Sequence, residues 1–413
     1  MWAVIPKPEI FSDESAWMQE WAERVSAQRE RQRCTRCVYT DEVPGIVFDE
    51  HGVCSYCRLH NYLDTQYPAG EDGQKQLEQV IEKVRKAGRG KAFDVVVGVS
   101  GGCDSSALVW MAKQWGLRPL AVHFDNTWNS QIAVENIHTV LDKLGVELYT
   151  HVVDNEVYDD IYRSFLLSGV PDIEAPTDIG LATTLYLPSL KYGIPYQFEG
   201  HSFRTEGVSP LGWMYMDGKY IESVVRQHGH FHEHGMRTYP NLTMARFLRF
   251  MLISRVKKIR PLYWMEYNKE ETKKKLTAEF GWKWYGGHHL ENRFTAFYHG
   301  YFLPRRWRID GRANGFSALI RSGQMTRADA ISQLEAPPTV EPGLIDLVKK
   351  RLGFSDEEFV RLMTLPFRSY RDYKTYKRTF ERMRPFFWLM YKLELVPQSF
   401  YIKYTARNQE SIS

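Results

Sequence analysis

Along the middle of this chain, the spacing of apolar residues alternates between a pattern typical of strands and a pattern typical of helices. The run 95–99 is rich in valine, which is typical of a parallel strand buried on both faces. Later stretches place apolar residues three and four positions apart, as in a helix with one buried side. This alternation predicts an α/β fold with a doubly wound parallel sheet. The predicted strands are 95–99, 119–125, 146–153 and 195–200, and the predicted helices are 104–115, 130–144, 156–168 and 179–192.

Helical periodicity also predicts elements on both sides of this domain. Trp17, Trp21 and Val25 form a narrow apolar stripe on a helix over 13–31 that docks on the rest of the chain. A second helix over 74–86 ends before a glycine-rich turn. Asn268 is expected to begin a further helix, with Glu271 three residues on as in a capping box. We therefore expect six parts: an N-terminal helical extension (1–33), a zinc ribbon (34–63), a connector helix (64–92), the main α/β domain (93–260), a helical substrate-pocket region (261–336) and a basic helical C-terminal extension (337–413).

The first strand of the main domain ends in a glycine turn. It breaks at Ser100-Gly101-Gly102, and Asp104 and Ser105 can begin the next helix by accepting hydrogen bonds from its first N–H groups. A strand, a glycine turn and a helix N-terminus together form an anion site. The turn is neither a Walker A loop nor a G-x-G-x-x-G fingerprint. The motif S-G-G-x-D-S instead resembles the PP-loop of the ATP pyrophosphatases, which holds the pyrophosphate end of ATP while a substrate oxygen is adenylated.

Polar residues stand where the other predicted strands end. In a doubly wound sheet, ligands bind beyond the carboxyl ends of the strands. Asp125-Asn126 end the second strand, where an acidic residue commonly meets a ribose or adenine edge, although Asp125 also suits a simple turn. Thr205-Glu206 follow the fourth strand and are placed either at the reacting substrate or in a surface loop.

Four of the five cysteines form one cluster. Cys34-x-x-Cys37 and Cys54-x-x-Cys57 can place four thiolates around one Zn²⁺ ion. A turn at Pro44-Gly45 and a short strand at Ile46–Phe48 are expected between the two pairs. Four thiolates close the coordination shell, so the zinc is expected to be structural. An iron–sulfur cluster and unligated cysteines are the alternatives.

Composition narrows the class of protein further. The 413 residues carry 54 Lys and Arg against 50 Asp and Glu, and a net charge of +4 does not demand a nucleic-acid partner. No run of about 18 apolar residues occurs, so no transmembrane segment is expected. The first residues do not resemble a signal peptide, so the expected location is cytoplasmic.

Three segments allow more than one interpretation. The histidine row from His228 to His234 either binds metal or is a solvated loop. The region around Gly286-Gly287 either closes over an anionic substrate or packs helices. The arginines behind it, Arg305, Arg306 and Arg308, either meet phosphates or form a basic surface. The basic, aromatic C-terminal extension suits a membrane surface or RNA, but packing or a partner contact is favoured.

Several separated stretches together resemble the N-acetyl sugar amidotransferases of bacterial surface-polysaccharide synthesis. The resemblance covers roughly 33–376. It rests on the cysteine ribbon, the PP-loop, the Thr205-Glu206 region and two longer motifs, V-H-F-D-N-T-W-N-S at 122–130 and the stretch from W-Y-G-G at 284–287 to S-G-Q-M-T-R at 322–327.

The resemblance implies an activity and roles for particular residues. An acetamido group on a nucleotide sugar becomes an acetamidino group, while ATP gives AMP and pyrophosphate. Catalytic roles are expected for Asp104, near Mg²⁺, and for Glu206 and His289, which with Thr205 belong to the substrate pocket. No chemistry is expected of Cys103 or His201. Pyrophosphate is assigned to Ser100, Gly101, Gly102, Ser105 and Ser106, and adenosine to Asp125 and Asn126.

No glutaminase is visible in the sequence. Trp2 stands where an N-terminal-nucleophile amidotransferase carries cysteine, and Cys103 is the one thiol outside the cluster. Ammonia is therefore expected from a separate glutaminase subunit or from free ammonium. The alternatives are a tRNA-thiolating enzyme, which needs a reactive cysteine beyond the ribbon, and a non-catalytic scaffold.

Overall fold

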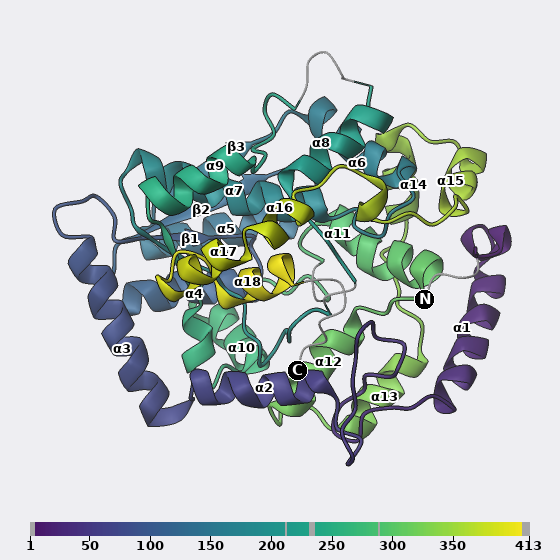
Figure 1. The fold of residues 1–413 in the computed structure, drawn as a ribbon, viewed down its shortest axis with the longest axis horizontal. Coiled ribbons are helices and arrows are strands. Elements are labelled where there is room, and N and C mark those ends of the chain that lie inside the picture. Colours follow the sequence, from purple (N-terminus) through teal and green to yellow (C-terminus); the bar gives the residue numbers. More distant parts are fainter. Residues whose placement is uncertain (1–4, 211–212, 231–235, 288–289, 407–413) are drawn as a thin grey trace.

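A five-stranded parallel sheet forms the centre of the molecule. The computed structural model describes residues 5–210, 213–230, 236–287 and 290–406 (Figure 1). The strand order is β3-β2-β1-β4-β5, and Val97 of β1 pairs with Ala121 of β2 and Phe198 of β4. The strands are β1 (Val95–Gly98), β2 (Pro119–Asp125), β3 (Leu148–Val152), β4 (Tyr196–Phe198) and β5 (Lys257–Ile259). The predicted α/β sheet is confirmed; β5 was missed because three residues with two lysines show no strand pattern.

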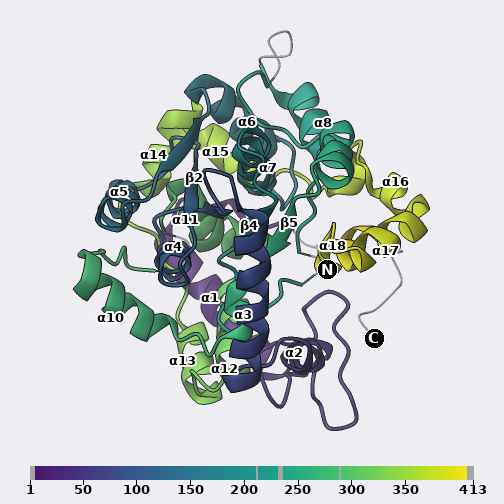
Figure 2. The same cartoon turned by 90° about the vertical axis from the view of Figure 1, so that its left-hand side faces the viewer.

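Successive residues of β1 face opposite layers of helices. Val95 and Val97 pack against α3 (Gly70–Ala87), α4 (Cys103–Gln114) and α5 (Gln131–Leu144). Val96 packs with Leu185 of α7 (Ala175–Lys191). Figure 2 shows α6 and α7 on the other side of the sheet from α3 and α4. This double layer explains the uninterrupted valine run, since both faces of the strand are buried.

The predicted helices of the main domain are present with shifted ends, and α8 was not predicted. The other helical elements are η1 (Pro8–Phe11), α1 (Glu14–Arg29), α2 (Ser55–Gln66), α6 (Asn155–Leu167), α8 (Gly218–His228), α9 (Met244–Leu248), η2 (Arg249–Ile253), η3 (Pro261–Trp264), α10 (Lys269–Phe280), α11 (Arg293–Phe297), η4 (Tyr298–Trp307), α12 (Arg312–Arg321), α13 (Arg327–Glu335), α14 (Leu344–Leu352), α15 (Asp356–Met363), η5 (Tyr370–Asp372), α16 (Lys377–Arg382), α17 (Arg384–Lys392) and α18 (Gln398–Thr405).

The N-terminal helix docks as expected, and arginines secure it. Trp17 and Trp21 are buried in an apolar cluster that also contains residues of the main domain, of 261–336 and of α14. The Arg305 guanidinium lies 4.7 Å from the Trp17 ring centroid and donates to the Ile10 carbonyl. Arg306 is buried and donates to the Met363 and Leu365 carbonyls. Both proposed roles, phosphate binding and a basic surface, are therefore wrong for Arg305 and Arg306. Arg308 is exposed and forms an ion pair with Glu20 at 2.9 Å. The division into six parts remains a prediction.

Within the described residues, no helix combines the length and apolar character needed to cross a membrane.

Candidate functional site

The phosphate loop lies between β1 and α4. Gly102 is the N-cap of α4, so the predicted start at Asp104 and Ser105 is wrong by one to two residues. Because glycine has no side chain, the space in front of the helix N-terminus stays open for an anion. Inside the loop, Ser105 Oγ accepts a hydrogen bond from the Ser100 amide at 3.3 Å and donates to the Gly102 carbonyl at 3.2 Å. These bonds hold the loop in one conformation before a ligand arrives.

Gly101 cannot be replaced without moving its neighbours. Its φ is +79°, and an added Cβ would lie 2.1 Å from the Ala133 carbonyl oxygen in α5. Its carbonyl accepts hydrogen bonds from the Trp282 indole at 3.0 Å and from the Asn136 amide at 3.3 Å. The loop is therefore braced from behind by α5 and by the segment after α10.

We expect Gly101→Ala to destabilise the fold by about 3 kcal/mol or more, because it combines a left-handed backbone with a clash against backbone. Gly90→Ala is the matched control: its φ is +75° and nothing lies within 4 Å of the added Cβ, so a cost of about 1–2 kcal/mol is expected. Urea unfolding of both variants measures the difference. Equal losses would contradict this account of the loop.

Asp104 faces the cavity beside Lys269, a contact that the sequence pattern did not predict. Its carboxylate accepts a hydrogen bond from the Tyr267 hydroxyl at 2.5 Å and forms an ion pair with Lys269 at 2.7 Å. Lys269 also lies 3.7 Å from Glu206. Lys269 is the first residue of α10, whose N-cap Asn268 was correctly predicted. These contacts join the phosphate loop, α10 and the loop after β4.

The two carboxyl groups differ in charge state at neutral pH. Burial raises the pKa of Asp104, but the charge of Lys269 and the hydrogen bonds outweigh it and lower the pKa below its usual value. Burial and the negative charge of Asp104 raise the pKa of Glu206 to about 8. Burial likewise raises the pKa of Glu291, which faces the same space. The site thus holds one ionised carboxylate next to one carboxyl that keeps its proton.

Glu206 makes the stability of the protein depend on pH. Its pKa rises from 4.5 to about 8 on folding, so the folded state binds this proton more tightly. The resulting stabilisation is complete below pH 4.5 and is lost as the pH rises through 8. We expect the free-energy difference between wild type and Glu206→Gln to fall by about 2–4 kcal/mol between these limits. Urea unfolding at several pH values tests this, and parallel pH curves would contradict it.

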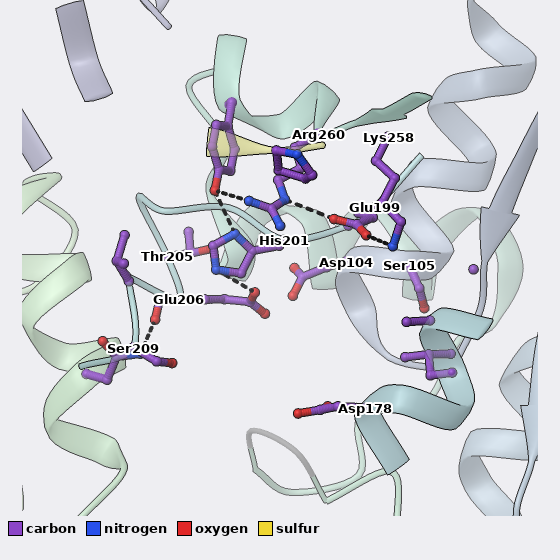
Figure 3. A pocket seen from close by; sticks show the side chains of 18 of the residues that line it. Asp104, Ser105, Asp178, Glu199, His201, Thr205, Glu206, Ser209, Lys258 and Arg260 are labelled. Atoms are coloured by element: carbon purple, nitrogen blue, oxygen red, sulfur yellow. Dashed lines mark hydrogen bonds and ion pairs between the residues drawn. The ribbon is translucent and has the colours of Figure 1, made fainter. Parts of the chain in front are cut away.

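A second charged cluster lies at the carboxyl end of β4 (Figure 3). Glu199 forms ion pairs with Lys258 at 2.8 Å and Arg260 at 3.0 Å. Burial raises the pKa of Glu199, but these two cations outweigh it and hold that pKa well below its usual range. His201 contacts the Tyr263 hydroxyl and the Gly207 carbonyl, each at 3.0 Å. Burial lowers its pKa to about 4, so His201 is neutral and acts as a hydrogen-bonding strut.

One cavity of about 2020 Å³ connects these groups. Its walls come from the phosphate loop, α7, the loop after β4, α10 and the segment 284–319. Asp178 of α7 points into it from the side opposite Glu206 (Figure 3). Burial raises the pKa of Asp178 to about 6. The volume is large enough for more than one ligand of nucleotide size.

The predicted site residues are distributed unevenly around this cavity. Those that line it are Ser100, Gly102, Asp104, Ser105, Thr205 and Glu206. Gly101 and Ser106 support the loop from inside. Asp125 accepts a hydrogen bond from the Thr127 amide, and the buried Asn126 bonds Tyr162, Trp128 and Asn292. These are turn and packing contacts, so the adenosine assignment stays a prediction. His289 lies outside the described residues.

The histidine row forms no metal site in the described part of the chain. His228 contacts the Tyr373 hydroxyl at 3.0 Å, and His230 lies 3.2 Å from Asp160. His232 and His234 are outside the described residues. Among the residues that the structure describes, the four ribbon cysteines are the one group of three or more His, Cys, Asp or Glu that could hold a metal ion.

The four ribbon cysteines are placed as zinc ligands are. They are buried, and all four sulfurs lie within 4.8 Å of one another. Cys34 and Cys57 are 3.8 Å apart, and Cys37 and Cys54 are 3.7 Å apart. Tetrahedral zinc with Zn–S bonds of about 2.3 Å requires sulfurs about 3.8 Å apart, so the four residues fit this metal. The predicted strand at 46–48 is wrong: isolated bridges join Phe48 to Cys54 and Arg33 to Thr40.

The ribbon is fastened to the wall of the cavity. Arg321 at the end of α12 donates to the Cys57 sulfur at 3.3 Å and to the Cys37 sulfur at 3.4 Å. The Tyr39 hydroxyl donates to Asn314 at 2.6 Å, and the Asn314 amide donates to the Glu206 carbonyl at 2.7 Å. The cysteine ribbon therefore fixes the backbone that carries Glu206.

Comparison with known protein families matches two separate segments of the chain, and both contribute residues to the cavity wall. Residues 94–188, hereafter the PP-loop segment, match the family model "Queuosine biosynthesis protein QueC". Residues 291–385, hereafter the WbpG-like segment, match "LPS biosynthesis protein WbpG-like, C-terminal domain". The chain therefore contains one segment similar to PP-loop enzymes and another similar to the C-terminal domain of WbpG-like LPS biosynthesis proteins. Both matches confirm the resemblance that the motifs indicated, and the PP-loop match indicates an enzyme that uses ATP.

Curated relatives match over a shorter range. The tRNA-specific 2-thiouridylases MnmA of Escherichia coli (strain K12) and Shigella flexneri serotype 5b (strain 8401) are each 30% identical over 132 residues. The match covers 28% of this chain and 36% of each relative. The chain thus spans about a third of the length of these relatives.

Several residues of the site escaped the sequence analysis. Lys258 and Arg260 come to the cavity on and directly after β5, and Tyr267 and Lys269 come just before and at the start of α10; all four follow an irregular segment. The one available signal was the Asn268 helix start, which places Lys269 in a first turn but does not give its direction.

Proposed function

We propose that this protein is an ATP-dependent amidotransferase of bacterial surface-polysaccharide (O-antigen) synthesis. It converts the acetamido group of a nucleotide-activated N-acetyl sugar into an acetamidino group. One observation carries the proposal: the PP-loop segment and the WbpG-like segment line a single cavity. Ser100 and Asp104 come from the first, and Glu291, Tyr298 and Asn314 from the second.

The proposed chemistry joins one amide, one ATP and one ammonia. The amide oxygen attacks the α-phosphorus of ATP, and the bond to pyrophosphate breaks. The product is an O-adenylyl imidate, which has lost the amide proton. Ammonia then forms a C–N bond at the imidate carbon, and AMP leaves with the former amide oxygen. The protein contributes mainly positioning and charge stabilisation.

Residues of the site have distinct parts in this proposal. The phosphate loop, with Ser100 and Ser105, binds the pyrophosphate end of ATP. Asp104 is the carboxylate that would hold Mg²⁺, and the ion would neutralise phosphate charge. Lys269 keeps Asp104 ionised and adds positive charge beside the leaving pyrophosphate. A carboxyl with a pKa of about 8, as in Glu206, can exchange a proton with ammonia as the C–N bond forms.

The direct test is incubation of the purified chain with ATP, Mg²⁺, ammonium and a panel of nucleotide-activated N-acetyl sugars. We expect AMP together with one sugar product that is lighter by the difference between oxygen and NH, seen by mass spectrometry. AMP formation without a modified sugar across a broad panel would contradict the proposal.

We also propose that a separate glutaminase subunit supplies ammonia. The support is that Cys103, the one cysteine outside the ribbon, is buried and lies 3.7 Å from the Tyr267 hydroxyl. Burial raises the pKa of its thiol to about 12, so it is not a thiolate nucleophile. The chain alone is expected to use ammonium and not glutamine. Glutamine hydrolysis by the chain alone would contradict this proposal.

tRNA thiolation is the second candidate, because the MnmA relatives are tRNA-specific 2-thiouridylases. A thiolating enzyme needs a reactive sulfur, and the buried Cys103 is poorly suited to that role. Cys103→Ala is therefore expected to keep the rate of sugar amidination within about threefold of wild type. Loss of activity in this variant, together with salt-dependent binding of tRNA, would favour thiolation.

A further inference from the structure

Helix α17 has two apolar faces, and the protein covers one of them. Phe387 and Met390 are buried against Phe380 and against Met251 of η2. On the other face, Trp388 and Leu389 are each 48% exposed and Leu393 is 51% exposed. Leu389 and Leu393 are four positions apart and lie next to each other along the helix, and Trp388 is about 100° around the helix axis from Leu389. The exposed face is therefore not needed to hold α17 in place.

The segment that packs against α17 also presents apolar side chains to solvent. Leu252 and Ile253 of η2 are exposed, the latter by 76%. Fourteen large apolar residues of the described chain are exposed, and five of them lie on η2 or at 388–393. We call these five residues the α17 patch: Leu252, Ile253, Trp388, Leu389 and Leu393. An exposed apolar group of this kind marks an interaction site when its residues cluster.

The exposed charged residues of the same two segments, 243–260 and 377–393, are mostly basic. One exposed acidic residue, Glu394, follows Leu393 directly and forms an ion pair with Lys257 at 2.9 Å, and Glu381 of α16 is half-buried. The exposed basic residues there are Arg246, Arg249, Arg255, Arg378, Arg382 and Lys392. Figure 2 shows α16 and α17 at the edge of the molecule, away from α1 and α10. The exposed side chains of these two segments are therefore predominantly basic, and α16 and α17 lie at the periphery of the fold.

We propose that the α17 patch binds the surface of an anionic lipid bilayer. Tryptophan and leucine side chains on a helix enter the boundary between headgroups and acyl chains, and arginine and lysine around them attract anionic headgroups. The predominantly basic surroundings favour this occupant over a second copy of the chain, because two copies would bring mostly like charges together. The inference does not depend on the proposed reaction.

The test is sedimentation of the full chain with vesicles of phosphatidylcholine alone and with added phosphatidylglycerol. Each basic residue near an anionic surface contributes about a fivefold gain in binding, so at least about a tenfold preference for the anionic vesicles is expected. Trp388→Gln/Leu389→Gln and Arg378→Gln/Arg382→Gln should each lower vesicle binding about tenfold or more. Rising salt should weaken binding of wild type.

Ile132→Gln/Val134→Gln on α5 is the matched control, because these apolar residues are also exposed. It should bind vesicles as wild type does. All variants are compared by thermal melting to exclude misfolding. Equal binding to neutral vesicles, no binding to either kind, or loss of a dimer in Trp388→Gln/Leu389→Gln without an effect on vesicles would overturn the proposal.

Discussion

Asp104→Asn is expected to lower ATP-dependent turnover by about a hundred- to a thousandfold, the usual cost of losing one preorganised electrostatic contact. Asp104 is the ionised carboxylate of the phosphate loop, and Lys269 and Tyr267 hold it in place. Asparagine keeps the shape of the side chain and removes the charge that would attract Mg²⁺ in the proposed reaction. The measurement is exchange of labelled pyrophosphate into ATP, with Mg²⁺ varied.

The neighbouring Cys103→Ala is a control for damage to the loop, because its thiol is buried and contacts the Tyr267 hydroxyl and the Lys269 carbonyl but carries no charge that could attract an ion. A higher Mg²⁺ requirement in Asp104→Asn, at a melting temperature close to that of wild type, would connect the loss to the ion. Exchange within about tenfold of wild type would show that Asp104 is not the group on which this site depends.

Loss of the ribbon metal is expected to abolish turnover although none of the four cysteines lines the cavity. Structural zinc contributes about 10–16 kcal/mol to the folding of small zinc domains. Without it, Arg321 loses its two sulfur acceptors and Tyr39 loses its fixed position. Asn314 then no longer holds the Glu206 carbonyl, so the site fails through its supporting contacts.

Cys54→Ser tests this chain of contacts, with Cys103→Ser as the matched variant of a buried cysteine outside the ribbon. We expect Cys54→Ser to lose zinc, measured by elemental analysis, and to melt at least about 10 °C lower. Cys103→Ser should keep one zinc per chain. A Cys54→Ser protein that retains zinc and full activity would refute the proposed role of the ribbon, and iron in wild type would indicate a different centre.

Local signals in the sequence were enough to predict the sheet, the phosphate loop and the metal cluster. A valine run fixes β1, glycines fix the turn after it, and paired cysteines fix the ribbon, because each feature depends on residues that are close in sequence. The same logic predicted the N-cap Asn268.

Features that depend on tertiary contact were missed. Lys269 meets Asp104 across 165 positions, and Arg306 reaches a carbonyl 57 positions away. A lysine at the start of a helix can face a cavity or solvent, and the neighbouring sequence does not distinguish the two. Likewise, the sequence leaves the guanidinium groups of Arg305 and Arg306 free to bind phosphate, whereas in the folded protein helix packing buries both.

Arg321 also changes the reactivity of the ribbon. Four thiolates around Zn²⁺ carry a formal charge of −2, and the guanidinium of Arg321 donates to two of the sulfurs. Such hydrogen bonds draw electron density from sulfur and make it a weaker nucleophile. The metal-bound ribbon should therefore react slowly with oxidants and alkylating agents, and its cysteines should be oxidised more slowly than zinc-bound thiolates that accept no such hydrogen bond.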